Sequence, residues 1–157
     1  MSASTWAIQP QDRERVIKAA IEAKGFAYSP YSKFRVGAAF ITTTGEIIKG
    51  CNVENASYGG TICAERTAIV KAVSEGTRSF TALAVTSDVP STISPCGICR
   101  QVIREFCAQA MPIYLVPADY DKRISDGAAD GGVLETSIAE LLPYGFGPED
   151  LERPRQQ

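Results

Sequence analysis

The order of helical and strand-like segments restricts the fold of this chain more than any other feature of its sequence. Apolar residues at helical spacing that end near Gly or Pro predict helices, and short apolar runs predict strands. We expect helices over residues 11–24, 63–75, 97–109 and 137–142, and strands over residues 36–42, 46–51, 80–86, 112–116 and 133–135. Helices that alternate with strands after an initial hairpin imply a mixed sheet covered on both faces. The predicted fold class is therefore α/β, a three-layer α/β/α sandwich with a mixed sheet.

The length and charge of the chain indicate its organisation and exclude some partners. Its 157 residues suit one compact core, and we expect a single domain over residues 1–157. Within it, residues 119–132 are expected to form a surface loop, and residues 152–157 a flexible tail. The net charge of −2, without a basic run, predicts no nucleic-acid partner. Because no apolar stretch or signal pattern stands out, we expect a cytoplasmic protein without membrane contact.

The types of side chain present limit the possible chemistry. The chain has five cysteines and no histidine. In the cytoplasm thiols stay reduced, so the cysteines are interpreted as metal ligands, reactive thiols or small core residues. The lack of histidine excludes Ser-His-Asp and Cys-His catalysis and His-ligated zinc. Proton transfer near neutral pH must then involve a carboxylate, a thiol, a tyrosine, a lysine or a metal-bound water.

Three cysteines form a candidate metal site. Cys96 and Cys99 are separated by two residues at the start of a predicted helix, where the free amides favour the thiolate that zinc requires. Cys63, at the start of another predicted helix, can supply a third sulfur. Catalytic zinc sites keep three protein ligands and leave the fourth position to water. Cys51 and Cys107 are poorly placed as a fourth ligand, and we interpret both as small buried residues without a chemical role.

Two hypotheses from other classes compete with a catalytic zinc site. The pair Cys96 and Cys99 alone also fits a redox dithiol of the thioredoxin type, and the three cysteines alone fit a structural zinc module without turnover. A redox motif normally follows an early strand and needs no third cysteine, whereas this pair comes two-thirds along the chain. Stoichiometric zinc would distinguish the catalytic site from the redox protein, and turnover would distinguish it from the structural module.

Five motifs together resemble those of one enzyme family. The sequence Cys63-Ala64-Glu65 followed by Pro95-Cys96-Gly97-Ile98-Cys99 is the three-cysteine form of the zinc nucleobase deaminase signature. The chain resembles the small homotetrameric zinc-dependent cytidine deaminases, and the resemblance runs from about Tyr28 to Leu151. The remaining matching motifs are Tyr28-Ser29-Pro30-Tyr31-Ser32-Lys33-Phe34, Gly50-Cys51-Asn52-Val53-Glu54-Asn55-Ala56 and Leu141-Leu142-Pro143-Tyr144-Gly145-Phe146-Gly147-Pro148.

The resemblance implies a reaction and a role for Glu65. It implies hydrolytic deamination of cytidine and deoxycytidine to uridine and deoxyuridine plus ammonia, in pyrimidine salvage, with one Zn²⁺ per subunit. Zinc lowers the pKa of its bound water and so makes hydroxide available near neutral pH. Glu65 is expected to take the water proton, deliver it to N3 and later protonate the leaving amine. Outside this motif, a glutamate in the first turn would be interpreted as stabilising the helix dipole.

Two arginines are candidates to balance the charge of the site. Three thiolates on Zn²⁺ give a formal charge of −1, which weakens the ability of the metal to acidify water. Arg66 is the expected hydrogen-bond donor to a thiolate, and the resemblance implies the same role and an approach by Arg100. Without the motif, either arginine would be interpreted as a solvated helix residue.

The substrate contacts come mainly from the resemblance. Asn52 and Glu54, two apart in a strand or its exit, are expected to face the same way. In the family the matching pair binds the ribose 3′-OH, and a carboxylate there would repel a 3′-phosphate, which favours a nucleoside substrate. By itself the pair would be interpreted as an exposed strand edge. The resemblance also places Phe34, otherwise a core residue by composition, against the pyrimidine ring, and the backbone of Ala64 at the polar edge of the base.

The last expectation concerns assembly. Tyr58 and Phe146 resemble the aromatic residues that neighbouring subunits contribute to each other's pockets. The resemblance therefore implies a homotetramer with shared active sites, in which a monomer would be incomplete. An alternative within the family is deamination of a modified cytosine nucleoside such as an antibiotic, although Asn52 and Glu54 favour an ordinary ribose.

Overall fold

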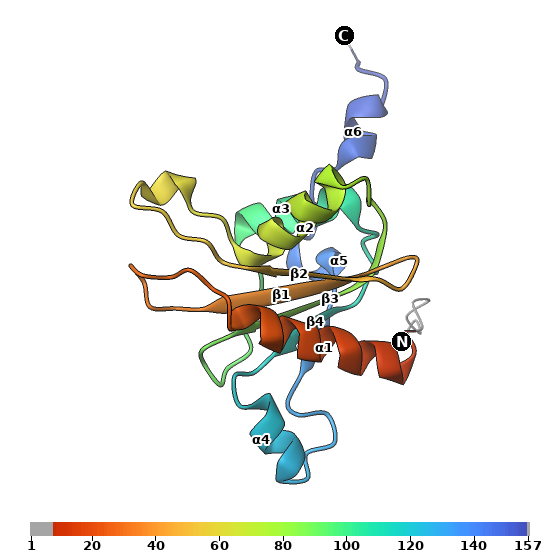
Figure 1. Ribbon diagram of the computed structural model, residues 1–157. Helices are drawn as coiled ribbons and strands as arrows, with labels where there is room; N and C mark the ends of the chain where they lie inside the picture. The colour runs from red at the N-terminus through yellow and green to blue at the C-terminus, as the bar shows by residue number, and fades with distance from the viewer. Residues whose placement is uncertain (1–7, 157) are drawn as a thin grey trace.

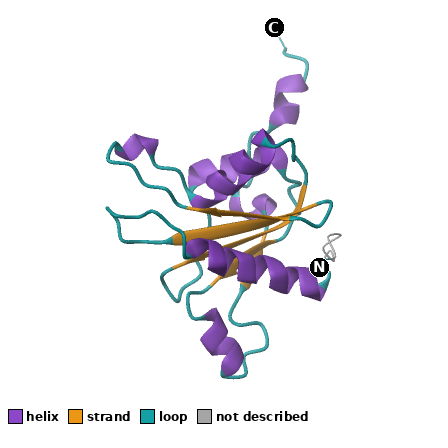
Figure 2. Cartoon of the chain, in the orientation of Figure 1, coloured by secondary structure: helices purple, strands orange, loops and turns teal. Residues whose placement is uncertain are grey.

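The computed structural model describes residues 8–156, which form a five-stranded mixed sheet with helices on both faces (Figures 1 and 2). The strand order is β2-β1-β3-β4-β5; β3 and β4 are parallel and the other neighbours are antiparallel. The predicted α/β/α sandwich is thus confirmed. The strands are β1 (Val36–Thr42), β2 (Ile47–Cys51), β3 (Phe80–Ser87), β4 (Ile113–Val116) and β5 (Leu134–Thr136).

The two faces of the sheet carry separate hydrophobic clusters. In Figure 1, α1 (Pro10–Lys24) lies below the sheet, and α2 (Ala64–Ser74) and α3 (Gly97–Phe106) lie above it. Alternate residues of β1 point to opposite faces, so Phe40 packs toward α2 and α3 while Ile41 packs toward α1. Both faces are covered, which explains why this strand is apolar from Val36 to Ile41 and not alternating.

Close contact between α2 and the sheet positions the start of that helix. Gly50 of β2 lies so near to α2 that a Cβ atom there would be 2.5 Å from the carbonyl oxygen of Ala64 and from the amide nitrogen of Ala68. The glycine therefore allows the helix backbone to rest directly on β2. Cys63 is the N-cap of α2, and Cys96 is the N-cap of α3. Both positions agree with the predicted helix starts.

Residues 119–132 were expected to form a surface loop. The structure corrects this expectation, because these residues contain helix α4 (Tyr120–Ser125). An ion pair of 2.8 Å joins Asp119 to Arg123 one helical turn on, and the Tyr120 side chain is buried. Gly131, with a φ of 61°, returns the chain directly over the Tyr120 ring. The Asp/Gly-rich composition concealed this helix because it is held by tertiary contacts, namely that of Tyr120 with Gly131 and the bond from Arg123 to the Pro90 carbonyl.

The C-terminal region has two more short helices, α5 (Ile138–Leu141) and α6 (Pro148–Glu152). The predicted capping box before α5 is half formed: the hydroxyl of Ser137 accepts from the amide of Glu140 at 3.4 Å, but the Glu140 carboxylate accepts from Thr136 at 2.7 Å. Helix α6 was not predicted, and it includes Glu152 of the expected tail. An ion pair with Arg104, which is 7% exposed, connects Glu149 of α6 to α3. Within the described residues, every helix is too short or too polar to cross a membrane.

Candidate active site and metal centre

The structure brings the three predicted metal ligands together. The sulfur atoms of Cys63, Cys96 and Cys99 all lie within 4.8 Å of one another, and those of Cys63 and Cys96 are 3.8 Å apart. Cys63 and Cys96 precede the first residues of α2 and α3, and Cys99 is in the first turn of α3. The site therefore lies where the positive ends of two helix dipoles meet, which stabilises negative sulfur.

This arrangement fits zinc. Tetrahedral coordination with Zn–S distances of about 2.3 Å places any two sulfurs about 3.8 Å apart, which is the separation of Cys63 and Cys96. Cys51 belongs to β2 and Cys107 is the C-cap of α3, so neither joins the cluster. Three sulfur ligands leave one tetrahedral position free, as in catalytic zinc sites.

Arg66 donates a hydrogen bond from Nη2 to the sulfur of Cys63 at 3.2 Å. Contact with the Cys99 thiol and with the Arg66 guanidinium lowers the pKa of Cys63 to about 5. In turn, the Cys63 thiolate raises the pKa of Arg66. The hydrogen bond between Cys99 and Cys63, together with burial, raises the pKa of the Cys99 thiol. The structure therefore contains the expected hydrogen bond from Arg66 to a cysteine ligand.

Glu65 lies beside the cluster without belonging to it. Its side chain is 4% exposed, and one carboxylate oxygen lies 3.6 Å from the sulfur of Cys99, which donates to it. Burial raises the pKa of the Glu65 carboxyl. A buried carboxylate with a raised pKa, next to a metal site, is suited to accept and return a proton near neutral pH.

A cavity of about 220 Å³, here called the main cavity, opens next to the cluster. Its walls come from the start of β1, the ends of β3 and β4, the start of α2 and the loop before α3. The lining residues that matter for the chemistry are Phe34, Asn52, Cys63, Ala64, Glu65 and Cys96. The rest of the lining is largely apolar, with Val36, Val85, Ile93 and Val116, which suits the faces of a flat ring.

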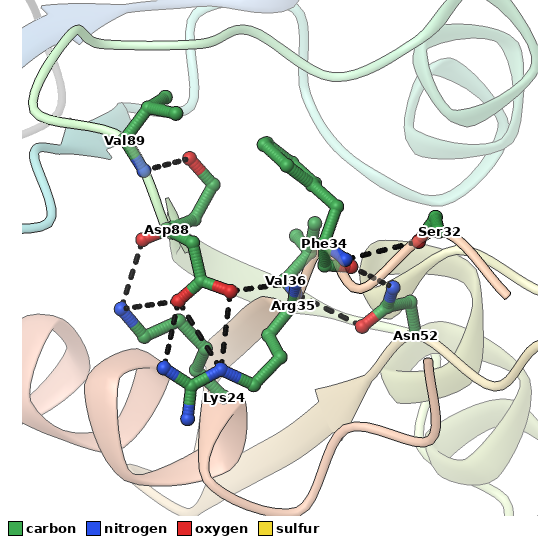
Figure 3. Close-up of polar contacts among 9 residues, drawn as sticks. Lys24, Ser32, Phe34, Arg35, Val36, Asn52, Asp88 and Val89 are labelled. Carbon is green, nitrogen blue, oxygen red and sulfur yellow. Dashed lines mark hydrogen bonds and ion pairs between the residues drawn. The ribbon is translucent and has the colours of Figure 1, made fainter. Parts of the chain in front are cut away.

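Asn52 and Phe34 are bound to each other at one wall of the main cavity (Figure 3). The Asn52 amide donates to the Phe34 carbonyl at 2.8 Å, and its oxygen accepts from the amide of Val36 at 2.9 Å. Asn52 is 8% exposed. It therefore fixes the backbone that carries Phe34, a role that the sequence did not predict.

Glu54 lines a second cavity of about 250 Å³, here called the Glu54 cavity, which shares Thr61 with the main cavity. The carboxylate accepts from the amides of Tyr31 and Ser32 at 3.0 and 3.1 Å, and from the Ser32 hydroxyl. These bonds from Ser32 lower the pKa of Glu54. Asn52 and Glu54 thus lie at adjacent cavities and not at one. Both residues follow the end of β2, and both side chains bond the segment that precedes β1.

The remaining candidates have no hydrogen bond to the sulfur atoms among the described residues. Arg100 donates to the carbonyls of Pro95 and Leu141 at 2.8 and 2.7 Å and to the Ser94 hydroxyl at 2.7 Å, so its guanidinium braces the loop before Cys96 and does not bond a sulfur. Tyr58 and Phe146 are 76% and 54% exposed. Tyr58 lines the Glu54 cavity, and Phe146 lines neither cavity.

Sequence reasoning missed two contributors to these cavities. Ser32 holds Glu54, and Asp88 bonds the residue that follows Phe34. Ser32 belongs to the motif of residues 28–34 that resembles the family, and this motif could have marked it as a site residue. No local pattern marks Asp88, because its partners are more than fifty residues away in the chain.

A cysteine cluster at two helix starts, beside a buried glutamate in an α/β/α sandwich, defines a zinc-dependent deaminase centre. The family described as "Cytidine and deoxycytidylate deaminase zinc-binding region" matches residues 10–115. The chain is 49% identical over 146 residues to the cytidine deaminase of Sporosarcina psychrophila, covering 93% of this chain and 99% of that one. It is 46% identical over 140 residues to the cytidine deaminase of Halalkalibacterium halodurans, covering 89% and 98%.

A solved structure agrees with these sequence matches. The crystal structure of the cytidine deaminase from Burkholderia pseudomallei superposes with a TM-score of 0.74 and 42% identity, covering 85% of this chain and 98% of that one. The chain belongs to the cytidine deaminase family, whose members are zinc-dependent hydrolases. Membership of this family sets aside the redox-dithiol interpretation of Cys96 and Cys99.

Proposed function

We propose that this protein catalyses the hydrolytic deamination of cytidine and deoxycytidine to uridine and deoxyuridine plus ammonia, in cytoplasmic pyrimidine salvage. The observation that supports it most strongly is the position of Glu65, which is buried, lines the main cavity and lies 3.6 Å from a sulfur of the cysteine cluster. Cys63, Cys96 and Cys99 would hold one Zn²⁺ per subunit. When bound there, Zn²⁺ supplies the Lewis acidity that makes water nucleophilic near neutral pH.

Glu65 performs the proton transfers. Its carboxylate accepts a proton from the attacking water and donates one to N3 of the pyrimidine as C4 becomes tetrahedral. It then takes the second water proton from the new C4 hydroxyl and passes it to the exocyclic amine, which leaves as ammonia while C4 becomes the carbonyl of uridine. Because burial raises the pKa of Glu65, the carboxyl can hold the proton between these steps.

Residues of the two cavities orient the nucleoside. Phe34 packs against the ring, and backbone groups of Ala64, at the start of α2, meet the polar edge of the base. Asn52 and Glu54 provide the ribose site, with Glu54 accepting from a sugar hydroxyl in the adjacent cavity. Its negative charge disfavours a 3′-phosphate, so a free nucleoside is the expected substrate. The ribose contacts also favour cytidine over a nucleoside analogue that lacks an ordinary sugar.

Assembly completes the site. Tyr58 and Phe146 expose large aromatic surfaces, a residue type that is enriched at protein–protein interfaces. We expect a homotetramer in which these side chains enter the pockets of neighbouring subunits. Arg100 supports this arrangement indirectly, because its bond to the Leu141 carbonyl holds the segment that leads to Phe146.

Ammonia release from cytidine tests the proposal. Zinc-loaded protein is incubated with cytidine and with cytidine 3′-monophosphate, and the Glu65→Gln variant, which keeps the shape of the side chain, serves as the comparison. We expect turnover of the nucleoside alone, and a loss of at least about 10³-fold in Glu65→Gln at unchanged zinc content. Zinc-loaded wild-type tetramer that releases no ammonia would overturn the assignment.

A further inference from the structure

The backbone that carries Phe34 is held by side chains and not by a strand ladder (Figure 3). The Phe34 amide donates to the Ser32 hydroxyl at 3.0 Å, and the Val36 amide donates to Asn52 at 2.9 Å. Lys33, immediately before, has a φ of 58°, a conformation that non-glycine residues rarely adopt. A segment in such a conformation keeps its shape only through these surrounding bonds.

Asp88 provides the third of these bonds, from the neighbouring wall of the cavity. The register of β1 and β3 pairs Val36 with Ser87, so Arg35 and Asp88 are the next residues along the two strands. Beyond the last pair of the two strands, the amide of Arg35 bonds a side chain and not a backbone carbonyl: it donates to the Asp88 carboxylate at 2.9 Å. The Arg35 guanidinium also donates through Nε and Nη2, at 2.8 Å for the shorter contact. Lys24 of α1 adds a cation 3.5 Å from the same carboxylate.

Asp88 is itself on a well-supported segment. The carbonyl of Val89 accepts from the amide of Ala118 at 3.0 Å, and the carbonyl of Pro90 accepts from Arg123 of α4 at 3.0 Å. Lys24 donates to the carbonyl of Ser87 at 2.8 Å. The segment after β3 is thus fixed from both sides. It can act as an anchor for the more strained segment around Phe34.

We propose that Asp88 is a positioning residue for substrate binding, which holds the Phe34 segment at the distance from β3 that the pyrimidine ring requires. Phe34 and Val36 face the main cavity, whereas Arg35 between them points away toward Asp88. The Asp88 carboxylate therefore holds this cavity wall from the side of the backbone that faces away from the main cavity, and it does not touch the substrate. This inference rests on the proposed function in one respect, namely that Phe34 contacts the base.

The charges around Asp88 suit this role at neutral pH. The carboxylate is 24% exposed and faces two cations, Arg35 from the residue just before β1 and Lys24 from α1. The Arg35 guanidinium holds the pKa of Asp88 below its ordinary value, so the carboxylate stays charged. Removal of the carboxylate would leave both cations without their anionic partner and the Arg35 amide without its acceptor.

The Asp88→Ala variant in the zinc-loaded enzyme tests the proposal. We expect KM for cytidine to rise about five- to twentyfold while kcat changes less than about threefold, because ring binding is weakened and the proton-transfer groups are untouched. Calorimetric titration with uridine should show the same loss of affinity without turnover. Glu22→Gln is the matched control: it breaks the 2.9 Å ion pair of Glu22 with Lys49, which joins α1 to β2 away from both cavities, and should leave KM unchanged.

Two milder variants keep the test decisive if Asp88→Ala does not fold. Asp88→Asn retains an acceptor for the Arg35 amide, and Arg35→Gln retains the backbone bond, so both should raise KM by a smaller factor. An unchanged KM and uridine affinity in all folded variants would overturn the inference, as would a fall in kcat at constant KM. Failure of the proposed function is seen separately, since wild-type protein would then release no ammonia.

Discussion

The replacement of Arg66 by glutamine removes the positive charge that lies next to a zinc ligand. Arg66 donates to the Cys63 sulfur at 3.2 Å, and the thiolate in turn raises the pKa of Arg66, so the guanidinium is permanently charged. Three thiolates and Zn²⁺ have a formal charge of −1. Without Arg66 the sulfurs donate more electron density to the metal, which then acidifies water less strongly.

The size of the effect follows from the single bond that is lost. A hydrogen bond to a charged group contributes about 1.5–3 kcal/mol. At about 1.4 kcal/mol for each tenfold change, its complete loss from the transition state would slow turnover about 10- to 150-fold. Arg66 bonds the Cys63 sulfur before and during the reaction, so only part of this energy is specific to the transition state. We therefore expect kcat to fall about tenfold, the lower end of the range.

The assay measures ammonia release and zinc content on the same sample. Arg66→Gln should retain one zinc per subunit, because the three sulfurs remain, and Arg66→Lys should recover part of the rate. Lys71→Gln is the control, since it removes a positive charge from the exposed end of the same helix. Turnover by Arg66→Gln equal to that of the control, at full zinc occupancy, would refute the charge-balance reasoning.

Three further predictions concern the substrate, the packing and the pH dependence. Glu54→Gln should raise KM for cytidine about tenfold and narrow the discrimination against cytidine 3′-monophosphate, measured as the ratio of kcat/KM values. Gly50→Ala should lower stability by about 1–3 kcal/mol or more in thermal unfolding, and zinc retention with it, because the new Cβ would lie 2.5 Å from the Ala64 carbonyl oxygen. Asp88→Asn should lower Tm at pH 7 but not at low pH. The folded pKa of Asp88 is depressed, so its stabilisation is present above the unfolded value of about 3.9 and is lost as the pH falls through the folded pKa. An equal Tm difference at pH 7 and pH 2.5 would contradict this last account.

Much of the fold was predictable because local patterns are strong where both faces of the sheet are buried. The strand over residues 36–42 was predicted with the bounds that β1 has, since a short apolar run followed by a turn signal favours a buried strand. Helix α4 was missed because its segment lacks an apolar stripe and depends on the contact of Tyr120 with Gly131. Helix α6 was missed although Pro148 and the acidic residues after it are a local signal for a helix start, and its ion pair with Arg104 joins residues 45 apart in the chain.

The candidate site was predictable to a different degree at each residue. Cys63 and Cys96 follow from helix starts, which the sequence marks by a switch from loop to helical spacing. The motif places Asn52 and Glu54 near each other, but only the fold shows that both side chains bond the segment before β1. Arg100 was expected to approach a thiolate, but it bonds the Pro95 and Leu141 carbonyls. These partners are backbone atoms, which no motif of side chains identifies.

The sequence by itself determined the chemistry that is available here: the lack of histidine removes imidazole as a metal ligand, the motifs supply three thiols, and Glu65 comes two residues after one of them. Only the tertiary structure decided which distant residues meet. The packing of α2 and α3 on one face of the sheet brings Cys63 to 3.8 Å from Cys96, and the end of β3 brings Asp88 to the backbone before β1. The physical reason is that helical and strand spacing act over a few residues. The approach of groups thirty to fifty residues apart depends on how the buried faces of helices and sheet fit together.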